Sequence, residues 1–261
     1  MMEEKTVLLL KAVEDIYPSC DPYFEKLQKA GITTMIIPTL EFIYINDEIL
    51  ENCLLSPEKF SGIIFTSPRT VKAVHRICET TGFNISKWQN KKSYAVGEAT
   101  SKLAASLLEL HLLGEEAGSS EELCKVILSS ADFEKFGEPF LFPCSQKSKD
   151  TVPKILTESG LEVKKVICYK TECNSHLEES LEKLIAENIG IPDIIVFFSP
   201  SGVEFSKKII KKFLLGNTNK PQCIAIGPTT EQAIKNAEMN LCKVAQKPNP
   251  DSVVEAVKSL L

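Results

Sequence analysis

Residues 63–71 read IIFTSPRTV and residues 195–203 read IVFFSPSGV, so the chain carries one pattern twice. In each copy an apolar run suited to a buried strand stops at Ser-Pro, and a stretch suited to a helix follows. Serine is a favoured N-cap residue, and proline is favoured at the first helical position. The pattern therefore predicts a strand-to-helix turn at two places in the fold.

Two further pairs of segments repeat in the same order. YAVGEAT at 94–100 corresponds to IAIGPTT at 224–230, and GSSEEL at 118–123 corresponds to PNPDSV at 248–253. Each member of the last pair precedes an amphipathic stretch. Self-similarity at this scale predicts two related α/β units.

Strands alternate with helices along most of the chain, which is typical of a parallel sheet. In the first copy we expect strands near 63–66, 93–96, 111–114 and 140–143 and helices near 69–79, 99–109, 120–129 and 148–158. In the second copy we expect strands near 194–198, 223–226 and 241–244 and helices near 178–187, 201–213, 229–237 and 251–260. A helix near 22–30 and two strands near 6–10 and 32–37 complete the second sheet from the N-terminal side.

The predicted fold class is α/β, with two doubly wound, flavodoxin-like parallel-sheet domains. One domain is discontinuous, residues 1–38 with 173–261, and the other, residues 45–165, is inserted into it. Residues 39–44 and 166–172 are expected to connect the domains as a two-stranded ladder. Ligands of such sheets bind beyond the carboxyl ends of the strands, so we expect the active site in the cleft between the domains.

Composition restricts the class of function. The 261 residues carry a net charge of -5, and the only arginines are Arg69 and Arg76, which disfavours a nucleic-acid surface. Lys11 interrupts the apolar run near the N-terminus, and no stretch reaches the ~18 apolar residues of a membrane span. The nine cysteines have no paired spacing, so we interpret them as reduced, mostly buried thiols and expect a cytosolic protein.

The Ser-Pro turns are the first candidate site. Ser67 and Ser199 can each cap the helix that follows, which is the simple interpretation. Two such turns at equivalent strand ends also present clustered backbone N–H groups at positive helix ends, which suit carboxylates or phosphates. The neighbouring residues that would share in such a site are Thr66, Ser201 and Gly202.

The next turns in each copy carry threonine. Thr100 follows Gly97, and Thr229 and Thr230 follow Gly227, where glycine lets the backbone approach a ligand closely. Capped helices again explain these residues equally well. No dinucleotide-binding or phosphate-loop motif occurs and no histidine has a metal-ligand spacing, so no cofactor and no metal are expected.

A third polar turn, PCSQKSKD at 143–150, ends another strand. Its lysines, including Lys149, would oppose the dipole of the helix that follows, so an anionic ligand or simple solvation could account for them. Cys144 lies in this turn without a histidine nearby and is interpreted as a packed thiol. Tyr169 lies on the expected connecting strand, where its hydroxyl could face the cleft or its ring could simply pack.

Together these motifs resemble uroporphyrinogen-III synthase, over nearly the whole chain. The segments that carry the likeness are FTSPR at 65–69, VGEAT at 96–100, LFPC at 141–144, VICYKT at 166–171, FFSPSG at 197–202 and IGPTT at 226–230. The likeness is greatest to the animal members of the family. It implies a lyase of heme biosynthesis that acts as a cytoplasmic monomer, with possible transient contact with the preceding pathway enzyme.

The resemblance implies that the chain cyclises hydroxymethylbilane, a linear tetrapyrrole rich in carboxylates, to uroporphyrinogen III. Water is lost, and the last ring is inverted through a spiro-pyrrolenine. Tyr169 matches the tyrosine that assists departure of the hydroxyl. The residues implied to hold substrate are Thr66, Ser67, Arg69, Thr100, Lys149, Ser199, Ser201, Gly202, Thr229 and Thr230.

A second interpretation stays open from the sequence. Two α/β lobes also describe a non-catalytic protein that binds or senses an acidic metabolite. Only an enzyme would change the isomer of the cyclised product, so the two interpretations differ in a measurable outcome.

Overall fold

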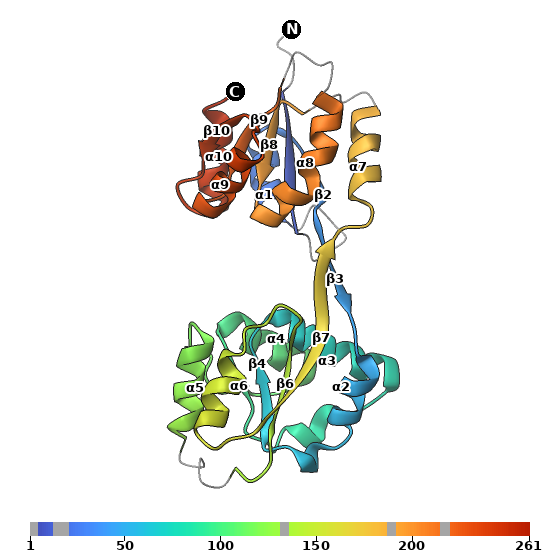
Figure 1. Ribbon diagram of the computed structural model, residues 1–261, viewed down its shortest axis with the longest axis vertical. Helices are drawn as coiled ribbons and strands as arrows, with labels where there is room; N and C mark the ends of the chain where they lie inside the picture. Colours follow the sequence, from blue (N-terminus) through green and yellow to red (C-terminus); the bar gives the residue numbers. More distant parts are fainter. Residues whose placement is uncertain (1–4, 13–20, 131–135, 187–191, 215–219) are drawn as a thin grey trace. The chain divides into compact units, whose positions relative to one another are not determined.

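A computed structural model of the protein describes residues 5–12, 21–130, 136–186, 192–214 and 220–261. The chain divides into two compact units (Figure 1). Unit 1 comprises residues 1–41 and 172–261, and unit 2 comprises residues 42–171. Each unit is an α/β layer structure built around its own sheet.

Unit 1 contains a five-stranded sheet in the order β10-β9-β8-β1-β2, with every neighbouring pair parallel. In chain order this is the flavodoxin-like arrangement 2-1-3-4-5, whose direction of winding reverses between β1 and β8. The central strand β8 is buried on both faces, as a doubly covered parallel strand requires. The strands are β1 (Thr6–Lys11), β2 (Thr33–Pro38), β8 (Ile194–Phe197), β9 (Gln222–Ala225) and β10 (Leu241–Val244).

Helices cover both faces of this sheet because alternate strand residues point to opposite sides. Leu8 and Phe197 pack with the buried residues of α7, α8 and α9, whereas Leu9 and Val196 pack with those of α1 and α10. The helices are α1 (Pro22–Lys29), α7 (Leu177–Leu184), α8 (Pro200–Leu214), α9 (Pro228–Asn236) and α10 (Pro250–Lys258).

Unit 2 contains a second five-stranded sheet, in the order β3-β7-β6-β4-β5. The pairs β4–β5, β4–β6 and β6–β7 are parallel, and the winding reverses between β4 and β6. The carboxyl ends of β4 and β6 therefore flank the position where a doubly wound sheet holds its ligand. The strands are β3 (Leu40–Tyr44), β4 (Gly62–Phe65), β5 (Tyr94–Ala95), β6 (Phe140–Ser145) and β7 (Val163–Cys173).

Two hydrophobic clusters again lie on opposite faces of the sheet. Phe65 packs with α2, α3 and α4, and Phe142 packs with α5 and α6. Trp88 is fully buried in the first cluster, where its indole N–H donates to the carbonyl of Leu54 at 2.9 Å. The helices are α2 (Asp47–Leu54), α3 (Pro68–Thr81), α4 (Glu98–Leu108), α5 (Ser120–Leu128) and α6 (Thr151–Glu158), with short 3-10 turns at Pro57–Lys59 and Ile85–Trp88.

The chain passes between the units in β3 and β7, which are neighbours in the sheet and run side by side in Figure 1. The amide of Ile45 donates to the carbonyl of Cys168 at 3.1 Å, and that of Asn174 donates to Thr39 at 3.1 Å. Partner numbers fall along one strand as they rise along the other, so β3 and β7 are antiparallel.

Some local expectations were wrong. Residues 111–114 form no regular strand, because Leu113 makes a single parallel bridge to Tyr94. Helix α6 begins at Thr151 rather than near 148, since a turn at 146–147 intervenes. Helix α2 was not predicted from the sequence. Residue 187, expected to end a helix, lies outside the described residues.

The third repeated pair supplies the N-caps of α5 and α10. The Ser119 hydroxyl accepts from the amide of Glu122 at 3.2 Å, and the Asn249 side chain accepts from the amide of Ser252 at 2.9 Å. None of the helices in the described ranges combines the length and apolar character that a membrane crossing needs.

Candidate functional site

In unit 2, β4 ends at Phe65, and Thr66 and Ser67 form the turn into α3. Strand β6 ends at Ser145, which is paired in the sheet with Tyr169 of β7. The amide of Gln146 then donates to the carbonyl of Tyr169 at 2.9 Å. Sheet pairing thus brings Tyr169 to the carboxyl end of the strands, the edge at which the Ser67 turn lies.

The hydroxyls of Ser67 and Tyr169 face each other at 3.4 Å between oxygens. Ser67 occupies the N-cap position of α3 but makes no side-chain cap bond, so its hydroxyl is not used for capping. Thr70 closes the turn instead, because its hydroxyl donates to the Ser67 carbonyl at 2.6 Å. The simple capping interpretation of Ser67 was therefore wrong.

An edge-to-face aromatic contact also holds Tyr169. Its side chain is only 7% exposed, and the ring of Phe42 meets its ring edge-on with centroids 6.4 Å apart. The guanidinium of Arg69 lies 3.5 Å from the centroid of Phe42. A cation so placed over an aromatic face is attracted to it and oriented by it. Arg69, Phe42, Tyr169 and Ser67 thus form a continuous chain of contacts within unit 2.

The remaining predicted residues of unit 2 differ in accessibility. Thr100 is buried in the first turn of α4, where its amide donates to the carbonyl of Gly97 at 3.2 Å. Gly97 has a φ of +78°, a conformation that favours glycine over residues with a Cβ. Lys149 is exposed before α6, and its carbonyl accepts from the hydroxyl of Ser148 at 3.2 Å.

In unit 1, β8 leads through Phe198 and Ser199 into α8. The Ser199 hydroxyl accepts from the amide of Gly202 at 3.0 Å and lies 3.2 Å from the hydroxyl of Ser201. A Cβ built on Gly202 would come within 3.3 Å of the Thr39 hydroxyl oxygen, so glycine permits close packing here. In this copy of the motif the capping interpretation is confirmed.

The second turn of unit 1 repeats that of unit 2 in its burial. Thr230 is 1% exposed in the first turn of α9, whereas Thr229 is exposed. Residues 223–230 and 93–100 follow the same order of buried, half-buried and exposed positions. Thr230 and Thr100 are therefore structural equivalents, and both point into their own unit rather than to solvent.

The structure also identifies residues that the sequence analysis missed. Phe42 belongs to the expected connecting segment, but its contact with Arg69 and Tyr169 depends on the pairing of β3 with β7. Lys11 was used only to end an apolar run, although it closes β1 at the same sheet edge as Ser199. The position of Lys11 at the end of a predicted strand was the sequence signal that could have marked it as a site residue.

The cysteines of the described segments are all free thiols, and Cys20 lies outside those segments. Burial raises the pKa of Cys144 to about 11, so this thiol stays protonated at neutral pH and is a poor nucleophile. Its interpretation as a packed residue is supported. Within the same segments, no three His, Cys, Asp or Glu side chains are grouped as metal ligands.

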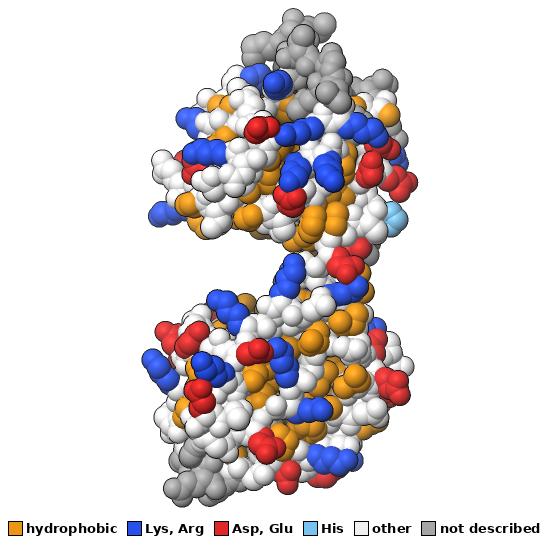
Figure 2. Space-filling view, in the orientation of Figure 1, with side chains coloured by type: hydrophobic (Ala, Val, Ile, Leu, Met, Phe, Trp, Pro, Cys, Tyr) orange, Lys and Arg blue, Asp and Glu red, His pale blue; other side chains and the backbone are white. Residues whose placement is uncertain are grey.

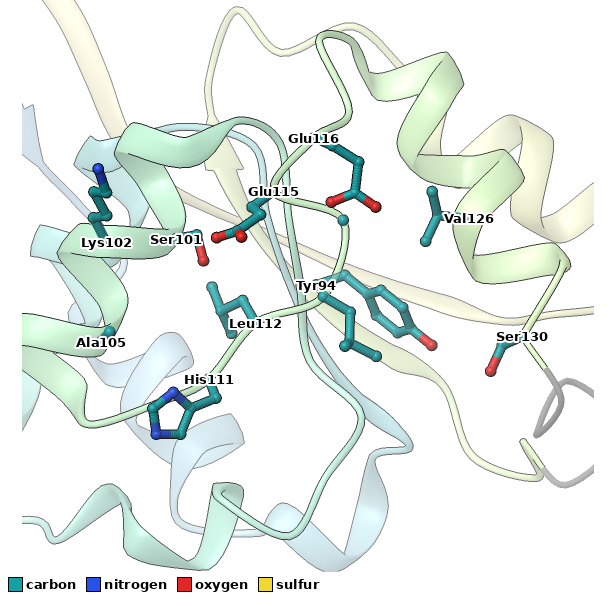
Figure 3. A pocket seen from close by; sticks show the side chains of 12 residues that line it. Tyr94, Ser101, Lys102, Ala105, His111, Leu112, Glu115, Glu116, Val126 and Ser130 are labelled. Atoms are coloured by element: carbon teal, nitrogen blue, oxygen red, sulfur yellow. The ribbon is translucent and has the colours of Figure 1, made fainter.

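Each unit has a hollow close to its strand-to-helix turns. One of about 530 Å³, beside β5 and between α4 and α5, is lined in part by His111, Glu115 and Glu116 (Figure 3). It contains none of the predicted site residues. A smaller one of about 350 Å³ lies between α8 and α9 and includes Ser201 and Lys207. Figure 2 shows acidic and basic side chains interspersed over the drawn face of each unit, without an extended basic field.

The protein is thus of the class with two doubly wound α/β units, each of which has hydroxyl-bearing turns at its strand ends. The family model described as uroporphyrinogen-III synthase HemD matches residues 21–255. The uroporphyrinogen-III synthase of Schizosaccharomyces pombe is 28% identical over 97% of this chain and 96% of its own length. That of Saccharomyces cerevisiae is 28% identical over 99% of this chain and 98% of its own length.

Solved structures agree on the fold. Uroporphyrinogen-III synthetase of Helicobacter pylori is 20% identical to this chain, with a TM-score of 0.58. The match covers 98% of this chain and 100% of that one. A mutant uroporphyrinogen III synthase of Thermus thermophilus has 14% identity and a TM-score of 0.55, with 98% of each chain covered. The chain belongs to the uroporphyrinogen-III synthase family and is an enzyme of tetrapyrrole biosynthesis.

Proposed function

We propose that this chain is a lyase that cyclises hydroxymethylbilane to uroporphyrinogen III, with loss of water and inversion of ring D. The observation that carries this assignment to particular atoms is the pairing of the Tyr169 and Ser67 hydroxyls at 3.4 Å. A buried phenol whose hydroxyl faces a serine hydroxyl at a strand end is suited to assist departure of a hydroxyl group.

The proposed first step breaks the bond between the terminal carbon and its hydroxyl. The pyrrole nitrogen supplies the electron pair that forms the azafulvene, and the hydroxyl leaves with the bonding electrons. A hydrogen bond or proton from Tyr169 stabilises the negative charge that develops on the departing oxygen, so that water is released. The proton that the pyrrole nitrogen loses replaces the one that Tyr169 gives up, directly or through solvent, so the net change is the loss of one water.

The later steps need orientation more than strong acids or bases. The azafulvene is intrinsically reactive, so the protein must determine which carbon of ring D it meets. Attack at the substituted carbon gives the spiro-pyrrolenine, which fragments and closes again as the inverted isomer. We assign this orientation to the turns of both units, whose helix N-termini and hydroxyls are suited to hold the acetate and propionate groups.

The residues proposed for this role belong to both units. Thr66, Ser67, Arg69 and Thr100 would act from unit 2, with Lys149 as a peripheral cation, and Ser199, Ser201, Gly202, Thr229 and Thr230 would act from unit 1. Thr100 and Thr230 are buried, so we assign them to shaping their turns, with the main-chain N–H groups meeting the carboxylates. We further propose a cytosolic monomer that needs no cofactor and contacts the preceding enzyme only transiently.

The decisive experiment adds purified protein to freshly made hydroxymethylbilane and resolves the porphyrins after oxidation. The expected product is the type III isomer, whereas spontaneous closure yields type I. A protein that bound the tetrapyrrole but left the type I isomer as the product would instead be the non-catalytic binding protein considered above.

A further inference from the structure

Lys11 lies at the position in unit 1 where a doubly wound sheet holds its ligand. It ends β1, and β8, the neighbouring strand, leads into Phe198 and Ser199. The winding reverses between these two strands, and ligands of such sheets bind outside the carboxyl ends at that reversal. The only cation-bearing side chain predicted beside a Ser-Pro turn was Arg69, in the other unit.

Three side chains surround the Lys11 ammonium, and together with Lys11 they define what we call the lysine box: Lys11, Asp21, Tyr23 and Phe198. The Lys11 ammonium pairs with the Asp21 carboxylate, and these side chains are only 14% and 11% exposed. The ammonium lies 4.6 Å from the centroid of Tyr23 and 4.9 Å from that of Phe198. Lysine is rarely covered to this extent, so its position is closely determined.

The lysine box is attached directly to the Ser199 turn. The amide of Phe198 donates to the Leu10 carbonyl at 3.3 Å, and the amide of Thr39 donates to the Lys11 carbonyl at 3.0 Å. Thr39 in turn packs against Gly202, in the first turn of α8. The end of β1 is therefore linked to the Ser199 turn directly through Phe198 and indirectly through Thr39. The Lys11 ammonium lies beside that turn.

Lys11 keeps hydrogen-bonding capacity. An ammonium has three N–H donors, and the Asp21 Oδ2 atom takes one of them. In the described part of the chain, no second acceptor is within hydrogen-bond distance of this nitrogen. An incoming carboxylate could therefore share the ammonium with Asp21.

The two units become equivalent once Lys11 is considered. In unit 2 Arg69 follows the Ser-Pro pair directly and stacks 3.5 Å from the ring of Phe42. The corresponding residue of unit 1 is Ser201, so its turn has no cation of its own. Lys11 places an aromatic-stacked cation at the same edge of the sheet, but from the neighbouring strand.

We propose that Lys11 is a carboxylate-binding residue of unit 1, which receives an acetate or propionate group of the tetrapyrrole beside the Ser199 turn. This inference rests on the proposed function, because it takes the substrate class from it. Asp21 orients the ammonium when no ligand is bound and shares it when a ligand arrives. The alternative is an ion pair that only fastens the start of α1.

The two oxygens of Asp21 allow these roles to be separated. Its Oδ1 atom caps α1 by accepting from the amides of Tyr23 at 3.0 Å and Phe24 at 3.2 Å, whereas Oδ2 pairs with Lys11. Asp21→Asn keeps an oxygen for the cap and removes the charge that competes with a ligand. Lys11→Met removes the cation but keeps most of the chain that packs between the rings.

The test is a fluorescence titration with uroporphyrin III, the octacarboxylate probe, on the full-length protein. Lys11→Met should raise Kd about tenfold or more, the effect of losing one hydrogen bond to a charged group. Lys11→Arg should restore most of the affinity, and Asp21→Asn should bind as tightly as the wild type or more tightly. The control is Lys29→Met, because Lys29 is 72% exposed on α1 and pairs with Glu25.

Two outcomes would overturn the inference. Lys11→Met could bind the probe as the wild type does, or Asp21→Asn could lose affinity and melting temperature together with Lys11→Met, as a purely structural pair would. Failure of the proposed function is detected separately, in the wild-type isomer assay. If the wild type makes the type III isomer and Lys11→Met binds the probe with unchanged affinity, the proposed function stands and only the role of Lys11 is contradicted.

Discussion

The same Ser-Pro pair has different uses in the two units. The Ser199 hydroxyl accepts a capping hydrogen bond from the amide of Gly202. The Ser67 hydroxyl makes no capping bond and faces the hydroxyl of Tyr169. The difference arises because β7 carries a tyrosine to the strand ends of unit 2. The chemistry of a turn residue is therefore set by the strand that arrives beside it.

Tyr169→Phe should lower turnover by roughly ten- to a thousandfold, the scale of losing one proton donor or strong hydrogen bond. The ring stays, so its packing against Phe42 and the melting temperature should change little. Residual product should still favour the type III isomer, because the turns hold the substrate. The measurements are single-turnover rates, isomer ratios and thermal melts.

Tyr94→Phe is the matched control, since Tyr94 is a fully buried tyrosine of the same unit outside the proposed site. Its turnover should stay near that of the wild type. Wild-type turnover in Tyr169→Phe, combined with a much lower melting temperature, would show that Tyr169 is a packing residue.

Buried thiols should make the protein less stable in alkali. Burial raises the pKa of both Cys168 and Cys223 to about 12, whereas these thiols ionise near pH 9 when unfolded. Their contribution is fully present below pH 9 and is lost as pH rises, because the unfolded chain alone releases the protons. Each thiol should lower the free energy of unfolding by about 1 kcal/mol per pH unit above pH 9.

The check is urea unfolding in reductant between pH 8 and 10.5. Cys223→Ala should reduce the slope of unfolding free energy against pH, although the variant is less stable overall. Val196→Ala, a buried change in the neighbouring strand without an ionisable group, should keep the wild-type slope. Equal slopes in the wild type and Cys223→Ala would contradict the argument.

At the scale of elements, close approach of backbones sets the geometry around β4. A Cβ on Gly62 would overlap the carbonyl oxygen of Lys92, and it would come within 3.0 Å of Phe140. The backbone carbonyl cannot turn aside as a side chain can. This contact keeps the segment before β5 against the start of β4, and so helps to place the Thr100 turn.

Gly62→Ala should therefore destabilise the protein by about 1–3 kcal/mol, the usual range for overpacking, or prevent folding. Gly82→Ala is the comparison, because Gly82 ends α3 at a φ of +69° with open space around it. Its cost should be the strain of a left-handed residue alone, about 1 kcal/mol. Chemical unfolding followed by Trp88 fluorescence measures both, and a smaller loss for Gly62→Ala than for Gly82→Ala would contradict the prediction.

At the scale of the whole molecule, the proposed substrate has to be held by residues of two units that are joined through β3 and β7. Two strands carry few contacts, and such connections commonly act as hinges. We predict that saturating uroporphyrin III lowers the radius of gyration and slows hydrogen exchange at the Ser67 and Ser199 turns. Small-angle scattering and exchange of the wild type measure this.

The control is the double variant Thr100→Ala, Thr230→Ala, which alters one turn in each unit. It should need more ligand to reach the same compaction, because the turns that meet the carboxylates are less well formed. Scattering and exchange that do not change at saturating ligand in the wild type would contradict the proposal that the ligand joins the units.

Sequence alone predicted the repeat, the strand-to-helix turns and the family resemblance, because these depend on local signals. Ser-Pro after a buried run, glycine before Thr100, and apolar alternation are short-range features that act within a few residues. The regular strand near 111–114 was the main exception among the expected strands. A run such as HLLG has the composition of a strand, but pairing with Tyr94 allows it one bridge.

The contacts that give the turns their chemistry depended on the tertiary structure. Tyr169 meets Ser67, Arg69 lies over the ring of Phe42, and Lys11 lies over the ring of Phe198, all through residues distant in sequence. Strand order and register decide which individual side chains meet at a sheet edge, and these contacts join residues from different strands. The sequence by itself determined which turns would form and what groups they would carry. Folding decided which of those groups would meet.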